Sequence, residues 1–103
     1  MKEKLDIQKR IENGEDVRFI GGHCFIGSGI IKKMQQLTRL VAVFLENGVS
    51  KKDTLTWADN MPRIRKHLFI KHYDLLWDAA NELLNGNDRY WEVSNDKIWR
   101  KNM

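Results

Sequence analysis

The sequence has 103 residues and a mass of 12.2 kDa, the length of one domain that can bury a core of its own. Hydrophobic residues make up 42% and charged residues 31%, which excludes a disordered polar segment and a membrane-embedded chain. Lysine and arginine exceed aspartate and glutamate by 18 to 14, so the net charge is +4 and negatively charged partners are favoured.

Several local features bear on the compartment. Acidic and basic residues alternate at the start of the chain with no apolar segment after them, so we expect no secretory signal. The longest apolar run, Leu40 to Leu45, is far shorter than the roughly 20 residues of a membrane span. Cys24 is the one cysteine, which excludes an internal disulfide, and we expect it to be a small buried apolar residue. These features predict a cytoplasmic protein.

The first half of the chain predicts two helices separated by a hairpin. Apolar residues at helical spacing, each series ending near an Asn-Gly pair, predict helices over about 2–13 and 29–47. Between them, two short segments rich in aromatic and β-branched residues flank a Gly-Gly pair. This pattern predicts a β-hairpin over about 16–27, and Ser28 is expected to cap the helix that follows.

The second half predicts a short helix, a long helix and a tail. Ser50 precedes an acidic residue by three positions, which is typical of a helix start, so we expect a helix over about 51–59. Apolar periodicity predicts one long helix over about 62–85, followed by an aromatic, basic tail over 87–103. We therefore expect a single domain, residues 1–103, of mainly α (α+β) class, with three to five helices and one short β-hairpin.

The predicted long helix is apolar around an unusually wide arc. An ordinary surface helix buries a stripe of somewhat over ~100°, and this arc is roughly twice as wide. Either the helix is central in the fold or part of the arc meets a second chain, and we expect a homo-oligomer, with a dimer favoured. In a monomer, the hairpin and the tail would cover the second flank. The side chains assigned to a partner or oligomer face are Phe69, Ile70, Tyr73, Trp77, Trp91 and Trp99.

The charges of the same helix run against its dipole. Cations lie in its first half and acids in its second half, although helix N-termini favour anions. A negatively charged partner would resolve this conflict, because N-terminal N–H groups and arginines attract phosphate. Alternatively, carboxylates elsewhere in the chain neutralise the cations. The candidate nucleic-acid- or anion-binding residues are Lys51, Lys52, Arg63, Arg65, Lys66 and Lys71.

The segment from Leu40 to Trp57 resembles the helix–turn–helix of DNA-binding proteins at about half of its positions. Gly48 fits the turn, whereas Phe44 and Thr54 do not fit their positions. The second helix would present Lys51, Lys52 and Thr54 at the end that meets bases in this motif. The alternative is a plain helical hairpin with a solvated lysine pair.

Catalytic and metal-binding patterns are weak. His67 and His72 are five residues apart, which separates them around a helix and makes them a poor chelating pair. A composite site with His23 and Cys24 is a minor alternative. The glycine-rich segment Gly21–Gly29 matches neither the Walker pattern nor the dinucleotide fingerprint. We therefore expect no catalytic residue, no metal and no cofactor, and no enzyme activity.

The tail interleaves aromatic and basic residues, as proteins that stack on single-stranded nucleic acid do, but we favour a lid over the core. The best functional hypothesis is a non-catalytic, nucleic-acid-associated regulator that uses a basic helical surface. An alternative is a small accessory protein or inhibitor, of the kind phages and mobile elements encode, that binds a host protein complex through an apolar helix face. A second alternative is a binder of a small anion or nucleotide.

Overall fold

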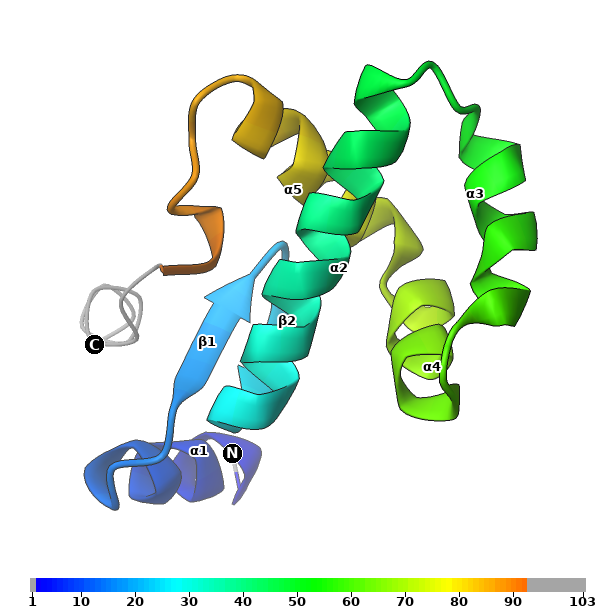
Figure 1. Cartoon of the computed structure of the whole chain (residues 1–103). Coiled ribbons are helices and arrows are strands. Elements are labelled where there is room, and N and C mark those ends of the chain that lie inside the picture. Colours follow the sequence, from blue (N-terminus) through cyan, green and yellow to red (C-terminus); the bar gives the residue numbers. More distant parts are fainter. Residues whose placement is uncertain (1, 93–103) are drawn as a thin grey trace. The chain divides into compact units, whose positions relative to one another are not determined.

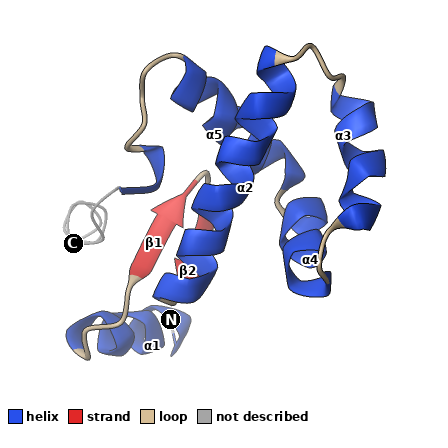
Figure 2. Cartoon of the chain, in the orientation of Figure 1, coloured by secondary structure: helices blue, strands red, loops and turns tan. Residues whose placement is uncertain are grey.

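The computed structural model describes the backbone of residues 2–92 and the side chains of residues 7–91 (Figure 1). Helices dominate this part of the chain, with one antiparallel hairpin (Figure 2), so the predicted mainly α class is confirmed. The elements are α1 (Lys2–Glu12), β1 (Val17–Ile20), β2 (His23–Ile26), α2 (Ser28–Glu46), α3 (Lys51–Trp57), the 3-10 turn η1 (Ala58–Asn60), α4 (Arg63–Lys71), α5 (Tyr73–Leu84) and the 3-10 turn η2 (Tyr90–Glu92).

The chain divides into two compact units. The first comprises residues 1–32 with 91–103, and the second comprises residues 33–90. Helix α2 begins in the range of the first unit and ends in that of the second. The expectation of a single domain stays a prediction.

The hairpin of the first unit follows from its Gly-Gly turn. Val17 pairs with Ile26 and Ile20 pairs with His23, which leaves two residues in the loop. Gly21 and Gly22 have φ values of 57° and 79°, and both central residues of a type I′ turn require positive φ. The sequence therefore predicted both the strands and their register-setting turn.

Trp91 completes the core of the first unit. Its ring meets Phe25 edge-on, with centroids 5.2 Å apart, and only 4% of the residue is exposed. The Arg18 guanidinium donates a hydrogen bond to the Trp91 carbonyl oxygen and another, of 2.9 Å, to the Asp16 carboxylate. The predicted role of the tail aromatics as a lid is thus confirmed for Trp91.

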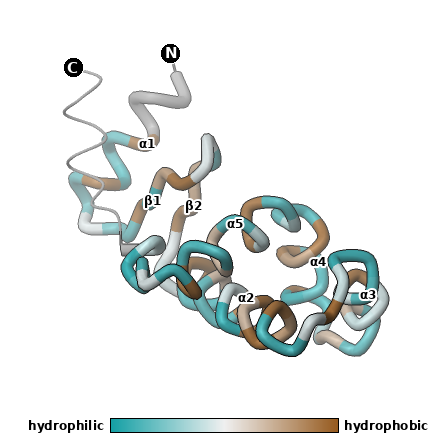
Figure 3. Tube along the Cα trace, turned by 90° about the horizontal axis from the view of Figure 1, so that it is seen from above, coloured by the Kyte–Doolittle hydropathy of each residue, from teal (hydrophilic) through white to brown (hydrophobic). Residues whose placement is uncertain are grey.

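The core of the second unit is built by amphipathic helices. Hydrophobic and hydrophilic stretches alternate along α2, α4 and α5 (Figure 3), as expected where each helix buries one stripe. Among the largest fully buried side chains are Met34 and Val41 of α2, Phe69 of α4 and Leu76 of α5. This core fixes the positions of α3 and α4, which carry the predicted cations.

The predicted unbroken helix over 62–85 is wrong, because it breaks at His72. This residue has φ −114° and ψ 32°, and it ends α4 and precedes α5. On the two sides of the break, Leu68 and Phe69 of α4 and Leu75, Leu76, Ala79 and Ala80 of α5 are buried, whereas Ile64 and Ile70 of α4 are exposed. The break also places Lys71 in the last turn of α4 and Asp74 in the first turn of α5, where the dipoles favour those charges.

Candidate functional site

Two of the six predicted cations are paired within the second unit. The Lys51 ammonium lies 2.8 Å from the Asp74 carboxylate, and the Lys66 ammonium lies 2.9 Å from the Asp59 carboxylate. The hydrogen bond to Asp74 raises the pKa of Lys51 above its usual value. Carboxylates elsewhere in the chain therefore neutralise part of the predicted anion site, as the alternative interpretation held.

Lys51 also lies over two aromatic rings. Its nitrogen is 5.3 Å from the ring centroid of Tyr73 and 5.8 Å from that of Trp77. The Tyr73 hydroxyl donates a hydrogen bond to the Lys51 carbonyl oxygen. These contacts join the start of α3 to the start of α5.

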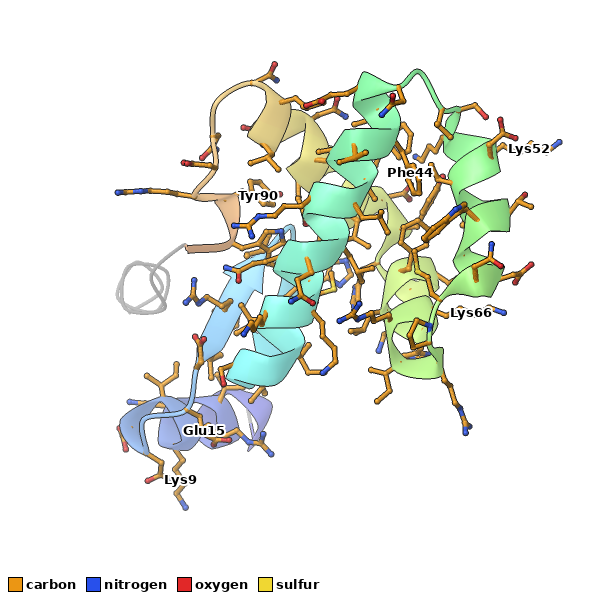
Figure 4. All side chains as sticks on the ribbon, viewed as in Figure 1. Lys9, Glu15, Phe44, Lys52, Lys66 and Tyr90 are labelled. Atoms are coloured by element: carbon orange, nitrogen blue, oxygen red, sulfur yellow. The ribbon has the colours of Figure 1, made fainter. Side chains whose placement is uncertain are left out.

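The other four predicted cations do not share one environment. Arg63 and Lys71 are exposed on α4, and Lys52 extends from α3 into solvent (Figure 4). The Arg65 guanidinium donates a hydrogen bond of 3.2 Å to the side-chain oxygen of Gln36 on α2. The structure thus does not gather the six residues into one cluster.

One face of α4 is both basic and exposed. Arg63, His67 and Lys71 are spaced four residues apart, which places them in a line along the helix, and all three are exposed. Ile64 and Ile70 flank this line and are 57% and 52% exposed. We call these five residues the basic face.

Two features of α4 make its basic face unusual. The helix contains no acidic residue, and its first turn carries cations where the dipole favours anions. Its opposite side is fixed in the core by Leu68 and Phe69, which are 7% and 0% exposed. The helix therefore holds the basic face outward in a fixed orientation.

The predicted partner face is wrong at two residues. Phe69 is fully buried, and its ring packs 5.4 Å from that of Tyr73 at the start of α5. Trp91 is buried against Phe25 in the first unit. Neither side chain is available to a partner in this structure.

The remaining members of that face have mixed positions. Ile70 is exposed, and it belongs to the basic face. Tyr73 and Trp77 are half-buried and pack beside Lys51. Trp99 lies outside the described residues. An apolar face continuous along residues 62–85 is therefore not formed.

The geometry of α2 and α3 favours a plain helical hairpin over a DNA-binding helix–turn–helix. Gly48 has φ 70° in the turn, and the Ser50 hydroxyl accepts a hydrogen bond of 3.2 Å from the Asp53 amide, which confirms the predicted cap. Thr54, expected to meet bases, is fully buried and its hydroxyl bonds with the Tyr73 hydroxyl at 2.8 Å. With Lys51 also engaged, α3 presents only Lys52 of its three predicted contacts.

A pocket of about 290 Å³ lies between α2, α3 and α4, and the sequence analysis missed it. Its walls are mostly apolar, and Arg65 is the charged residue among them. The Trp57 ring is held edge-on by Phe44, with centroids 5.2 Å apart, yet 42% of Trp57 is exposed. The lining residues are Gln36, Leu37, Leu40, Trp57, Asn60, Met61, Pro62 and Arg65.

Cys24 is exposed, so the prediction of a buried cysteine is wrong. It lies on β2 next to Phe25, and because successive side chains of a strand point to opposite faces, Cys24 faces away from the core in which Phe25 is buried. Partial desolvation raises the pKa of the Cys24 thiol, and the charge of Arg10 acts in the opposite direction. Among the residues that the structure describes, no three metal-ligating side chains lie together.

The raised pKa predicts slow thiol chemistry at Cys24. Since the thiolate is the nucleophile, the folded protein should react with a disulfide reagent more slowly near neutral pH than the urea-unfolded chain, despite the exposure. The reaction is followed by absorbance across a pH series, and the difference should close at high pH, where both forms are ionised. Equal rates at every pH would contradict this prediction.

No described helix has both the length and the apolar composition needed to cross a membrane. Comparisons of the chain with protein-family models, with curated proteins and with solved structures find no match.

Proposed function

We propose that the chain is a non-catalytic nucleic-acid-binding protein that contacts phosphates through the basic face of α4. The observation that carries this proposal is the line of Arg63, His67 and Lys71 along an acid-free helix with its other side locked in the core. Arginine and lysine neutralise phosphates, and each contact releases counterions from the nucleic acid. The His67 imidazole can donate a hydrogen bond to a phosphate oxygen.

The dimensions of the basic face suit a nucleic-acid backbone. Arg63 and Lys71 are eight residues apart, which is about 12 Å along the helix axis. Phosphates follow one another every ~3.4 Å of axis along one strand of a duplex, so the face spans roughly three such steps. Two or three phosphates can therefore be contacted together.

A second candidate function is docking on an acidic protein surface. It is favoured by Ile64 and Ile70, which are more than half exposed and contribute nothing to a phosphate contact. An accessory protein or inhibitor of a larger complex would use cations and isoleucines of the same face together. One experiment separates the two candidates.

The test measures affinity for a labelled oligonucleotide by fluorescence anisotropy across a salt series from about 50 to 200 mM. With two or three phosphates neutralised, log affinity for a duplex should fall with log salt at a slope of about −2 to −3. The double variant R63Q/K71Q should bind more weakly with a slope shallower by roughly two. A matched control is K9Q/R10Q on α1, which removes one lysine and one arginine at exposed positions of the other unit.

Two results would overturn the proposal. The first is an affinity for the oligonucleotide that does not change with salt concentration. The second is an equal loss of affinity in R63Q/K71Q and K9Q/R10Q. Either result means that the basic face does not contact phosphates. A single stoichiometric protein partner that survives nuclease, and that is released by I64S/I70S, supports the acidic protein surface in its place.

A further inference from the structure

We propose that the pocket between α2, α3 and α4 binds an unpaired nucleobase, with the attached phosphate on Arg65. This inference rests on the proposed function and adds a second contact to it. The phosphate contacts of the basic face do not distinguish one base from another or a single strand from a duplex. The pocket, in contrast, would select bases that can leave the stack.

Trp57 provides the stacking surface. The indole is 42% exposed at the pocket, and its edge-on contact with Phe44 holds its orientation. Leu40 and Met61 contribute further apolar wall. Stacking on an aromatic side chain is the main sequence-tolerant interaction by which proteins bind single strands, because every base has a π face.

The polar groups of the pocket match those of a base. Gln36 and Asn60 carry side-chain amides, which offer both hydrogen-bond donors and acceptors, as base edges do. An apolar pocket with a few converging polar groups is the usual form of a small-ligand site, and its volume is at the lower end of such sites. These amides could form hydrogen bonds with the edge of a flat heterocycle. An aliphatic peptide side chain offers no such hydrogen-bonding groups.

Arg65 supplies the charge complementarity. Among the lining residues it is the only ionised one, so the pocket favours an anion beside its apolar ligand. The contact with Gln36 uses one of the five N–H donors of a guanidinium, and the fork geometry of the others suits a phosphate. Pro62 lines the pocket and Arg63 begins the basic face, but Arg65 projects from the other side of α4, so a strand with a base in the pocket would reach the basic face around the N-terminal end of this helix.

The experiment compares a mixed-sequence single-stranded oligonucleotide, the same sequence as a duplex, and adenosine monophosphate, each titrated against the full chain. W57A should weaken single-strand binding by about 5- to 150-fold, the range for one stacked base, and change duplex binding by less than about twofold. W57F, which keeps a π face, should restore most of the single-strand affinity. L55A is the matched control, because Leu55 is 40% exposed on the same helix and does not line the pocket.

A second measurement keeps the inference testable if W57A does not fold. The chain has four tryptophans, so 5-fluorotryptophan labelling gives resolvable ¹⁹F signals, and W57F identifies that of Trp57. Addition of the oligonucleotide should shift the Trp57 signal. A shift with adenosine monophosphate as well shows that a free nucleotide suffices, and a shift with the oligonucleotide alone shows that a strand is needed.

The failure of this inference differs from the failure of the proposed function. If W57A and W57F bind single strands like the unchanged protein while R63Q/K71Q loses affinity, the pocket inference is overturned and the basic face stands. If no nucleic acid binds, the proposed function itself fails. Binding of an acidic peptide that depends on Trp57 and is not displaced by the oligonucleotide overturns the inference in favour of a protein ligand.

Discussion

Replacing Phe69 by alanine is expected to lower the free energy of unfolding by about 3–5 kcal/mol. Phe69 is 0% exposed, and its ring packs 5.4 Å from that of Tyr73, so truncation removes apolar burial and leaves a cavity in the core of the second unit. Urea denaturation followed by far-ultraviolet circular dichroism measures the loss.

The neighbouring residue is the matched control. Ile70 is 52% exposed, so I70A should change the free energy of unfolding by no more than about 0.5 kcal/mol. Comparable stabilities for F69A and I70A would mean that Phe69 does not pack in the core and would restore it to the partner face that the sequence predicted.

Replacing Trp91 by alanine should destabilise the first unit by about 3–5 kcal/mol. The ring is buried edge-on against Phe25, whereas the hydrogen bond from Arg18 goes to the main-chain carbonyl and survives the substitution. The loss therefore reports the contribution of the ring itself. Hydrogen exchange of the hairpin amides localises the effect.

The control for this variant is D88A, at an exposed position three residues before the tryptophan. The hairpin amides of D88A should exchange at the rate of the unchanged protein, and those of W91A should exchange faster. Unchanged protection in W91A would show that the tryptophan does not cover the hairpin.

Local elements were predictable because their causes are local. Gly21 and Gly22 adopt the positive φ that a tight turn requires, and Ser50 caps α3 through an amide three residues away. Each signal depends on residues within a few positions of one another. The hairpin and the starts of α2 and α3 were therefore found within one or two residues.

The break at His72 depends on tertiary packing, and periodicity does not reveal it. A helical wheel over residues 62–85 treats both halves as one rod, so it assigned Phe69 to an outer face that does not exist. The helix dipole gave no signal either. Lys71 and Asp74 lie near the middle of residues 62–85, where the dipole acts weakly, and only the folded chain shows that they end one helix and begin the next.

The sequence predicted which basic residues belong to the candidate site, but it did not predict which of them form ion pairs. The cations of α3 and α4 were named, but Lys51 and Asp74 are 23 residues apart, and no local pattern links them. The pocket draws its lining from α2, α3, η1 and α4, so only the folded chain assembles it. Self-association of the chain stays a prediction.

The exposure of Cys24 has a practical consequence for measuring that self-association. A lone surface thiol can join two molecules covalently on oxidation, and the product would pass for a dimer in light scattering or gel filtration. Oligomeric state should therefore be determined in the presence of a reductant, or with a C24S chain. Any dimer that persists under those conditions is held by non-covalent contacts alone.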